Sequence, residues 1–392
     1  MEKEQIYLVG GAVRDSLLGL SITERDWVVV GSSAQDLMNR GFKQVGKHFP
    51  VFLHPETGEE YALARTEKKN GFGHKGFKLN FPRSISIEED LKRRDFTINA
   101  IAQDMYGNII DPWGGQKDLK LKIIRHVSDA FSEDPLRVFR AARFNAKFSK
   151  LGFSIAPETL ELMKQMLSEN EIASISGERL WKETEHALET NSPEVFFKIL
   201  SKCDALKIVF PGIEKANSAQ ILLSLDTLKE SAEISLDSRV RFAALIYQLT
   251  KGLEDVKEVQ NKIFSRLKLP NKYKSLIKGV QLLATKYLAI MKLDGAHLAL
   301  LFKKLNGSQK NNDIELTALA CAAIFQKNLK ENENMAKVQY LMKAKDVFSK
   351  SNINTQSRNK LRGKDYGDAL FQAKIERLDF WINTSESKTR KL

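Results

Sequence analysis

The chain has 392 residues, a length typical of roughly two to three domains. Hydrophobic residues make up 42% and charged residues 28%, which excludes a wholly disordered or collagen-like chain. Lys and Arg total 62 against 49 Asp and Glu, a net charge of +13. This excess indicates a polyanionic partner such as nucleic acid, although an anionic membrane surface would attract the same charge.

Membrane and secretory features are the next classes to exclude. No apolar run approaches the roughly 18 to 20 residues that span a bilayer, so we expect no membrane role. The first residues are acidic and are followed by Gly10 and Gly11, which is not a signal-peptide pattern, and we expect a cytoplasmic protein. Cys203 and Cys321 lie far apart in apolar surroundings, so we expect both to be reduced core residues.

The first ~130 residues alternate short β-rich segments with helical ones. Apolar runs at residues 6–9 and 27–30 predict buried strands. Thr57-Gly58 and Gly107-Asn108 are turn-forming pairs between further β-rich segments and predict two hairpins. We therefore expect antiparallel pairing in this part of the chain.

Helix starts are also visible in this region. Residues 11–14 follow a glycine pair, Ser33 has Asp36 three residues on, and Ser86 precedes an acidic helical segment. Ser at such a position caps a helix by accepting a hydrogen bond from the first turn. Short strands interspersed with capped helices predict a mixed α/β head.

From Asp134-Pro135 onward the periodic apolar residues predict consecutive helices joined by short polar links. The fold class is therefore α+β, with a mixed or antiparallel sheet in the head and an all-helical remainder. Residues 385–392 are polar and basic, and we expect a flexible terminus there.

A glycine turn joins the first predicted strand to the first helix. Gly10 and Gly11, with Arg14 one turn on, expose backbone N–H groups in the arrangement that cradles phosphate. An ordinary tight turn has the same sequence, and the Gly-x-Gly-x-x-Gly spacing of a dinucleotide fold is missing.

Two carboxylates stand at the start of the second strand. Glu24 and Asp26 are two residues apart, so on an extended chain both side chains project to one face. Paired carboxylates hold Mg²⁺, and a two-metal displacement at phosphorus needs such ligands. Taken alone the pair also fits a polar strand entry, but its position beside the glycine turn favours the metal site.

These residues resemble a known family in five motifs that occur in order. The glycine turn with its carboxylate pair is similar to the first motif of the class II tRNA nucleotidyltransferases, which include the CCA-adding enzymes, and of the related bacterial poly(A) polymerases. Four further motifs are residues 93–100 (RRDFTINA), 111–119 (DPWGGQKDL) with Arg125, 133–144 (EDPLRVFRAARF) and 178–183 (ERLWKE). The similarity is greatest to CCA-adding enzymes of gamma-proteobacterial type.

The resemblance implies a domain plan and an activity. Residues 1–132 would be the nucleotidyltransferase catalytic head, 133–205 a helical neck with the nucleotide-selecting helix, and 206–384 a helical body and tail that binds tRNA. The activity would be template-independent addition of CCA to tRNA from CTP and ATP with Mg²⁺. The protein would be a monomer or weak homodimer. A poly(A) polymerase and a catalytically weakened tRNA-binding relative are the alternatives.

The resemblance also implies roles in the nucleotide site. Gly10, Gly11 and Arg14 would hold the triphosphate, and Arg94 would contact the ribose. Asp134 and Arg137, three residues apart on one helical face with Arg140 a turn further, would read the base, because a carboxylate accepts from the exocyclic amine of cytosine or adenine while Arg donates to the ring nitrogen. Asp134 before Pro135 also fits a helix cap. Arg143 lies about half a helical circumference from Asp134, which favours phosphate or another wall.

Two positions depart from the family. Glu24 stands where the family has Asp, so a metal ligand is one methylene longer. Tyr247-Gln248 stands where longer relatives carry the His-Asp of an HD phosphohydrolase, so we expect no such activity.

Two basic regions complete the expectations. Residues 66–78 are basic and glycine-rich, which suits the flexible loop that supports final A addition in CCA-adding relatives. Basic residues of the helical region are candidates for tRNA phosphate contacts, with solvated helix faces as the alternative: Arg239, Arg241, Lys272, Lys274, Lys278 and residues 358–364.

Overall fold

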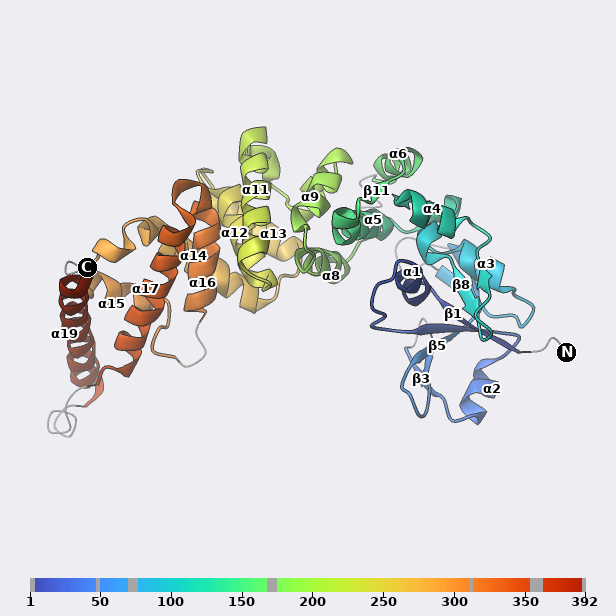
Figure 1. The fold of residues 1–392 in the computed structure, drawn as a ribbon, viewed down its shortest axis with the longest axis horizontal. Coiled ribbons are helices and arrows are strands. Elements are labelled where there is room, and N and C mark those ends of the chain that lie inside the picture. The colour runs from blue at the N-terminus through green and yellow to red at the C-terminus, as the bar shows by residue number, and fades with distance from the viewer. Residues whose placement is uncertain are drawn as a thin grey trace. The chain divides into compact units, whose positions relative to one another are not determined.

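The computed structural model describes residues 4–46, 50–69, 77–167, 175–309, 313–352 and 362–389. The chain divides into two compact units, residues 1–209 and 210–392 (Figure 1). The first holds the sheet and several helices, and the second is helical, which confirms the predicted α+β class. The finer division of the chain at residues 132 and 205 stays a prediction.

A seven-stranded sheet lies in the N-terminal part of the first unit (Figure 1), with strand order β3-β4-β5-β2-β1-β8-β9. The pairs are antiparallel except β2 and β5, which are parallel, so the sheet is mixed. The strands are β1 (Gln5–Val9), β2 (Asp26–Val30), β3 (Lys43–Val45), β4 (Val51–Leu53), β5 (Glu60–Leu63), β8 (Ala102–Asp104) and β9 (Ile109–Ile110).

The local signals of the head are confirmed. Antiparallel pairing joins β4 to β5 around Thr57-Gly58 and β8 to β9 around Gly107-Asn108. Ser33 and Ser86 each form a capping box with the acidic residue three positions on, at the starts of α2 (Ala34–Asn39) and α3 (Ile87–Lys92). Strands β6 (Thr66–Lys69) and β7 (Phe77–Asn80) pair antiparallel, and the centre of the predicted flexible loop, residues 70–76, lies outside the described residues.

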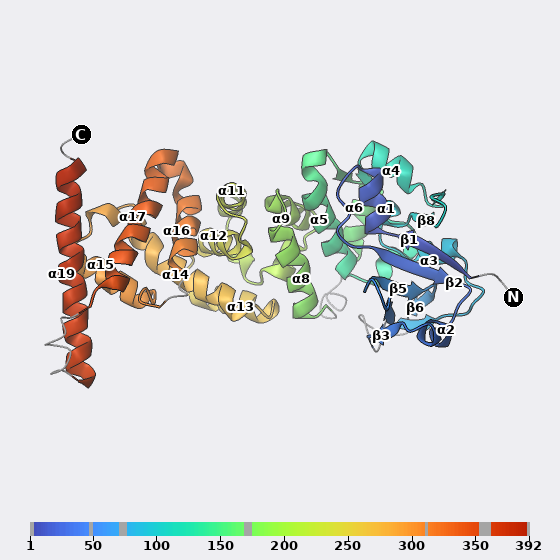
Figure 2. The same cartoon turned by 60° about the horizontal axis from the view of Figure 1, so that its bottom comes forward.

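The two faces of the sheet bury different clusters. Val9 and Val28 pack with Leu91 of α3 on one face, whereas Val29 packs with Leu37 of α2 on the other. Since side chains two apart share a face, Asp26 lies on the face of Val28. Figure 2 shows β1 beside β2, with α1 (Gly11–Leu17) following β1. This topology places the carboxylate of Asp26 at the strand end that meets the glycine turn.

Helix α5 (Leu136–Phe148) links the sheet region to the other helices of this unit. It packs against α8 (Gly177–Leu188) and α9 (Pro193–Lys202) through a buried face that includes Phe139 and Ala142. Its other face carries Arg137, Arg140 and Arg143, at helical spacing. The other helices in the described part of the unit are 3₁₀ helices η2 (Thr97–Asn99), η3 (Asp129–Glu133) and η4 (Ser149–Leu151), with α4 (Gly115–Leu121), α6 (Pro157–Gln165) and α10 (Leu206–Val209). A short parallel pair, β10 (Ile123–Ile124) and β11 (Ser154–Ile155), lies beside α5.

The second unit packs around α12 (Ser238–Thr250), whose neighbours are α11 (Ser218–Ile234), α14 (Asn271–Tyr287) and α16 (Ile314–Phe325). In the described residues, no helix is both long and apolar enough to cross a membrane. The helix α19 runs over Gly363–Thr389, so a helix occupies residues 385–389 of the expected flexible terminus. The other elements are α13 (Val256–Arg266), α15 (Gly295–Lys304), α17 (Glu331–Lys350), η5 (Ile213–Lys215), η6 (Ile290–Lys292) and η7 (Gln326–Asn328).

One predicted tRNA contact is wrong. Arg241 is 1% exposed and donates to the carbonyl oxygens of Ser235 and Ala232, which makes it a structural residue that cannot reach RNA. The cysteine prediction is confirmed, because Cys203 and Cys321 are both free and buried. Burial raises the pKa of the Cys203 thiol to about 11, so it remains protonated near neutral pH.

Candidate active site

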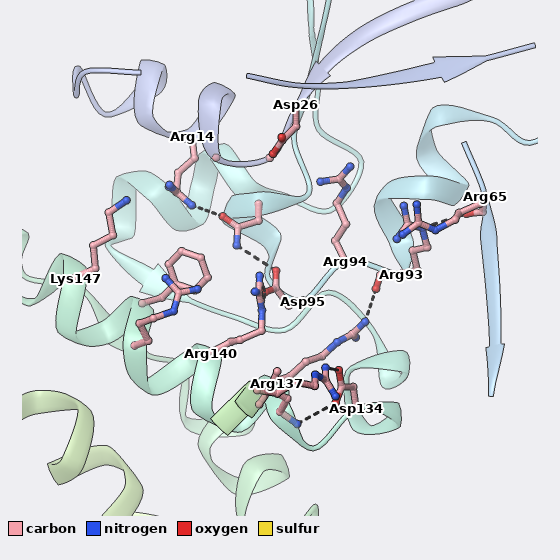
Figure 3. Close-up of a pocket in the computed structure, with 17 residues that line it drawn as sticks. Arg14, Asp26, Arg65, Arg93, Arg94, Asp95, Asp134, Arg137, Arg140 and Lys147 are labelled. Carbon is pink, nitrogen blue, oxygen red and sulfur yellow. Dashed lines mark hydrogen bonds and ion pairs between the residues drawn. The ribbon is translucent and has the colours of Figure 1, made fainter. Parts of the chain in front are cut away.

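A cleft of about 540 Å³ opens in the first unit (Figure 3). Nine of the ten predicted site residues line it, and Glu24 is the exception. Its charged lining is cationic, which indicates an anionic ligand. The charged residues are Arg14, Arg65, Arg93, Arg94, Arg137, Arg140, Arg143, Lys147 and Arg179, with Asp26, Asp95 and Asp134.

The glycine turn forms one end of the cleft. Gly10 caps α1 with φ 69° and ψ −126°, a conformation that side-chain-bearing residues rarely adopt. A Cβ atom at Gly10 would lie 3.1 Å from Nη1 of Arg94, a tight contact that would require the Arg94 side chain to shift. Arg94 approaches on one side of the turn and Arg14, from α1, on the other (Figure 3).

Arg14 is the most buried arginine of the cleft, with 4% of its surface exposed. It donates to Oδ1 of Asn99 at 2.6 Å and to Oδ1 of Asp15 at 2.8 Å. Burial lowers the pKa of the guanidinium, and the charge of Asp15 opposes that effect. These bonds fix the guanidinium beside the glycine turn.

A chain of hydrogen bonds continues from Asn99 across the floor of the cleft. Asn99 donates to Oδ1 of Asp95 at 3.1 Å, and Nε of Arg140 donates to Oδ2 of Asp95 at 2.7 Å. Burial alone would raise the pKa of Asp95, but the charge of Arg140 and the bond from Asn99 outweigh it and lower the pKa to about 2. Asp95 is therefore ionised and ties helix α5 to the segment that holds Arg14.

The far part of α5 adds positive charge. Arg143 donates from Nε to Oε2 of Glu183 at 2.5 Å, and its guanidinium lies 4.4 Å from the ring centroid of Phe144. Lys147, one turn further, lies 3.8 Å from a carboxylate oxygen of Asp15. Partial burial, followed by the charge of Arg14, lowers the pKa of Lys147.

The other end of the cleft is built around Asp134. Its Oδ1 accepts from the backbone N–H of Leu136 at 3.1 Å, and its Oδ2 accepts from Nη2 of Arg179 at 2.7 Å. Arg137 donates to the carbonyl oxygens of Ala130 at 2.9 Å and Arg93 at 2.7 Å. Asp134 therefore caps α5 and also faces the cleft, beside an Arg137 that the backbone holds in place.

Asp26 is the first residue of β2, where it pairs with Val9 of β1, and its side chain lines the cleft. Glu24 lines an adjoining hollow of about 360 Å³, which Asp26 also lines. Partial burial raises the pKa of Asp26, the charge of Arg94 opposes this, and Glu24 adds to the rise. The two carboxylates therefore line one hollow, and the charge of Glu24 acts on Asp26.

The donor set suits a hard divalent cation, since carboxylate oxygens are the ligands that Mg²⁺ prefers. Within the described ranges, no cluster of three or more His, Cys, Asp or Glu side chains is arranged to hold a metal ion. Glu24 and Asp26 alone would leave several coordination positions for a triphosphate and water.

Eight residues of the cleft lie outside the predicted site, and four of them make the contacts described above: Asp95, Asn99, Lys147 and Arg179. Three of these four lie in the motifs of residues 93–100 and 178–183. Lys147 follows Arg143 by four positions on α5, so helical spacing identifies it as a neighbour. Some of their partners lie too far along the chain for local patterns to reveal: Arg14 for Asn99, Arg140 for Asp95 and Asp134 for Arg179.

Family models match two parts of the chain. Residues 6–125 match "Poly A polymerase head domain", and residues 152–217 match "Probable RNA and SrmB- binding site of polymerase A".

Individual proteins and structures are similar over most of the chain. The "Multifunctional CCA protein" of Acinetobacter baumannii (strain SDF) is 40% identical over 98% of this chain and 99% of its own. The "CCA-adding enzyme" of Blochmanniella pennsylvanica (strain BPEN) is 54% identical over 64% of each chain. A solved CCA-adding enzyme in complex with CTP has a TM-score of 0.72 at 26% identity, covering 96% of this chain and 88% of that one. The Thermotoga maritima CCA-adding enzyme complexed with tRNA has the same fold, with a TM-score of 0.69 at 24% identity over 96% and 87% of the two chains.

Proposed function

The chain belongs to the family of the CCA-adding enzymes, which are tRNA nucleotidyltransferases, and from this membership we propose that it adds C, C and A to the 3′ end of tRNA without a template. CTP and ATP are its substrates. The observation that supports this most directly is a single cationic cleft with the glycine turn and Asp26 at one end and Asp134 at the other.

The triphosphate lies against the glycine turn in this proposal. The backbone N–H groups at Gly10 and Gly11 and the guanidinium of Arg14 provide fixed positive charge there. Arg140 and Arg143 extend that charge along α5. Since these groups are already held by Asp95, Asn99 and Glu183, they need little reorganisation when charge develops on the phosphates.

Glu24 and Asp26 would hold magnesium, a cofactor that, when bound, activates the attacking hydroxyl and neutralises the triphosphate. The support in the structure is geometric, because both carboxylates line one hollow and Asp26 also lines the cleft beside the glycine turn. Metal dependence is general among nucleotidyltransferases of this family. The longer Glu24 side chain keeps the carboxylate that the family has as Asp.

The reaction joins tRNA to the α-phosphorus of the nucleotide. The 3′ hydroxyl oxygen of tRNA forms the new bond, the bond from the α-phosphorus to the bridging oxygen breaks, and pyrophosphate leaves with the electron pair. Arg14, Arg140 and Arg143 stabilise the negative charge on the phosphoryl oxygens and on the leaving pyrophosphate.

Base selection is assigned to the Asp134 end of the cleft. The Asp134 carboxylate accepts from the exocyclic amine of cytosine or adenine, and Arg137 donates to the neighbouring ring nitrogen. Uracil and guanine present a carbonyl instead, which faces the carboxylate and is rejected. Arg179 orients Asp134 at 2.7 Å, so it is a positioning residue for this step.

Arg94 is assigned to the ribose. Its guanidinium lies against Gly10 and pairs with Asp90 at 3.3 Å, beside the triphosphate end of the cleft. A donor at this position reaches a sugar hydroxyl when both ends of the nucleotide are bound. We also propose that the enzyme acts in the cytoplasm as a monomer or weak homodimer.

The direct test incubates the full-length protein with a tRNA that ends at the discriminator base. With CTP and ATP together, the proposal expects a product longer by three nucleotides, C, C and A. Incubation with each nucleotide alone separates the alternatives, because a poly(A) polymerase extends many RNAs with ATP and ignores CTP. A protein that binds tRNA but adds nothing until Glu24→Asp is introduced would identify the catalytically weakened relative.

A further inference from the structure

A second cavity lies entirely within the C-terminal unit. It has a volume of about 450 Å³ and is bounded by the end of α15, by Phe348 of α17 and by the first turns of α19. Lys303, Lys364 and Lys374 line it, against one carboxylate, that of Asp368. The cavity is therefore cationic although it is remote in sequence from the nucleotide site.

Lys374 is the unusual residue of this cavity because only 6% of its surface is exposed. A buried ammonium normally pairs with a carboxylate. Lys374 instead donates from Nζ to Oγ of Ser308 at 2.6 Å and lies 4.2 Å from the ring centroid of Phe348. Burial lowers its pKa, and no charged group of the described residues contributes to that shift.

Lys303, an exposed residue of α15 that also lines the cavity, likewise lies against an aromatic ring. Its Nζ lies 4.7 Å from the ring centroid of Phe371, one turn before Lys374 on α19. Aromatic faces stabilise a cation weakly and leave its N–H donors available for an anion. Two ammonium groups thus border one cavity, each against an aromatic ring, and neither pairs with a carboxylate of the described residues.

We propose that this cavity binds a phosphate group, with Lys374 as the buried anchor and Lys303 as the second cation. Lysine recognises phosphate as a point charge, and the hydroxyl of Ser308 adds a donor beside it. The phosphate has two possible sources, a phosphodiester of the tRNA backbone and free inorganic phosphate. The tRNA source rests on the proposed function, whereas the free phosphate does not.

The tRNA source is tested by steady-state CMP addition with the full chain. Lys374→Met keeps most of the side-chain volume and removes the charge. We expect KM for tRNA to rise about tenfold, with kcat and KM for CTP unchanged. The slope of log KM for tRNA against log salt should fall by about one. Lys303→Met tests the same site at an exposed residue, so a change in KM cannot be due to disruption of the core. Lys257→Met removes an exposed lysine elsewhere in the same unit and is the matched control.

The free phosphate source is tested by thermal melting of the same variants in inorganic phosphate against chloride of equal ionic strength. The nucleotide cleft also attracts phosphate. The quantity compared is therefore the rise in melting temperature caused by phosphate, in wild type and in Lys374→Met. A smaller stabilisation in that variant, with KM for tRNA unchanged, identifies free phosphate as the ligand. If both KM and the phosphate response match those of Lys257→Met, the site is refuted. A wild-type chain that adds no CMP refutes the proposed function, and the melting comparison still decides the site.

Discussion

Asp95 is a buried carboxylate on which two halves of the cleft depend. It accepts hydrogen bonds from Asn99 and Arg140, and its pKa falls to about 2. A folded-state pKa below the ordinary value of 3.8 means that the ionised form stabilises the fold. That stability is present above about pH 4 and is lost as the pH falls towards 2.

The variant Asp95→Asn tests this contribution. A shift from 3.8 to about 2 corresponds to about 2 kcal/mol, so we expect the variant to lose roughly that free energy of unfolding at pH 7. The gap to wild type should shrink between about pH 4 and pH 2, because protonation removes the same charge from the native residue. Urea unfolding of wild type and variant between pH 2 and pH 7 measures the loss and its pH dependence. Asp226→Asn, which removes an exposed ion pair with Lys327, is the control. A gap that is equal at pH 3 and pH 7 contradicts the assignment.

The carboxylates of β2 carry a second prediction. Asp26→Asn should lower kcat for CMP addition by at least about 100-fold, since the variant loses a charged ligand at the mouth of the triphosphate region. Glu24→Asp keeps the charge and should stay within about tenfold of wild type. Excess EDTA should abolish wild-type activity, and Mg²⁺ should restore it. Full activity of Asp26→Asn at saturating CTP would remove Asp26 from the metal site.

Asp134 carries the prediction about base choice. In Asp134→Asn, the amide presents both a donor and an acceptor, so the carbonyl of uracil no longer meets only negative charge. We expect the preference for CTP over UTP, as a ratio of kcat/KM values, to fall by about 100-fold. Asp129→Asn changes an exposed acid of η3 nearby and should leave the ratio unaltered. Unchanged discrimination in Asp134→Asn would leave the residue as a helix cap only.

At the scale of elements, α4 and η2 pack so closely that their contact admits only glycine. A Cβ atom at Gly115 would lie 2.3 Å from the carbonyl oxygen of Thr97 and 2.7 Å from a side-chain carbon of Ile101. The 3₁₀ helix η2 ends in Asn99, which holds Arg14 and Asp95. The close approach of two short elements therefore sets the position of a cleft residue.

Gly115→Ala should be costly for that reason. We expect a loss of about 2 to 4 kcal/mol in the free energy of unfolding, since backbone must shift to accept the methyl group. Gly367→Ala is the matched control, because its Cβ would meet nothing within 4 Å and alanine favours the helix. Equal melting temperatures for the Gly115→Ala and Gly367→Ala variants would contradict this account of the contact.

Elements also show which features of the fold can be predicted from sequence. The capping boxes at Ser33 and Ser86 depend on residues three apart, and the two hairpins depend on their turn pairs, so local patterns suffice. The parallel pairing of β2 with β5 joins segments 34 residues apart in register, as Asp26 opposite Glu60 shows. No local pattern in the sequence records that pairing.

The candidate site divides in the same way. Gly10 and Asp26 are predictable from turn and strand patterns together with the family motifs. The ion pair of Asp134 with Arg179 joins residues 45 positions apart, and Asp95 with Arg140 does the same. Arg241 shows the opposite error, in which a sequence pattern predicts a functional residue that is structural. Its basic side chain suggests a contact with RNA, but the residue is buried and donates to backbone carbonyl oxygens.

At the scale of the whole molecule, the net charge of +13 belongs to a protein that handles a polyanion. Association with RNA releases counterions, so its affinity falls steeply with salt. We expect KM for tRNA to rise much more steeply than KM for CTP between about 50 and 200 mM KCl. Initial rates with one substrate saturating measure the two dependences separately. Equal slopes would show that the excess positive charge does not contact tRNA.

The bonded series from Arg14 through Asn99 and Asp95 to Arg140 has one more consequence. In the proposed binding mode, this series fixes the distance between the triphosphate site and helix α5, which contacts the base. A pyrimidine and a purine must both be accommodated against that single length. In the proposed binding mode, the difference in ring size would be accommodated at Asp134 and Arg137, whose partners are another helix and main-chain oxygens, so the switch from C to A would depend on one wall of the cleft.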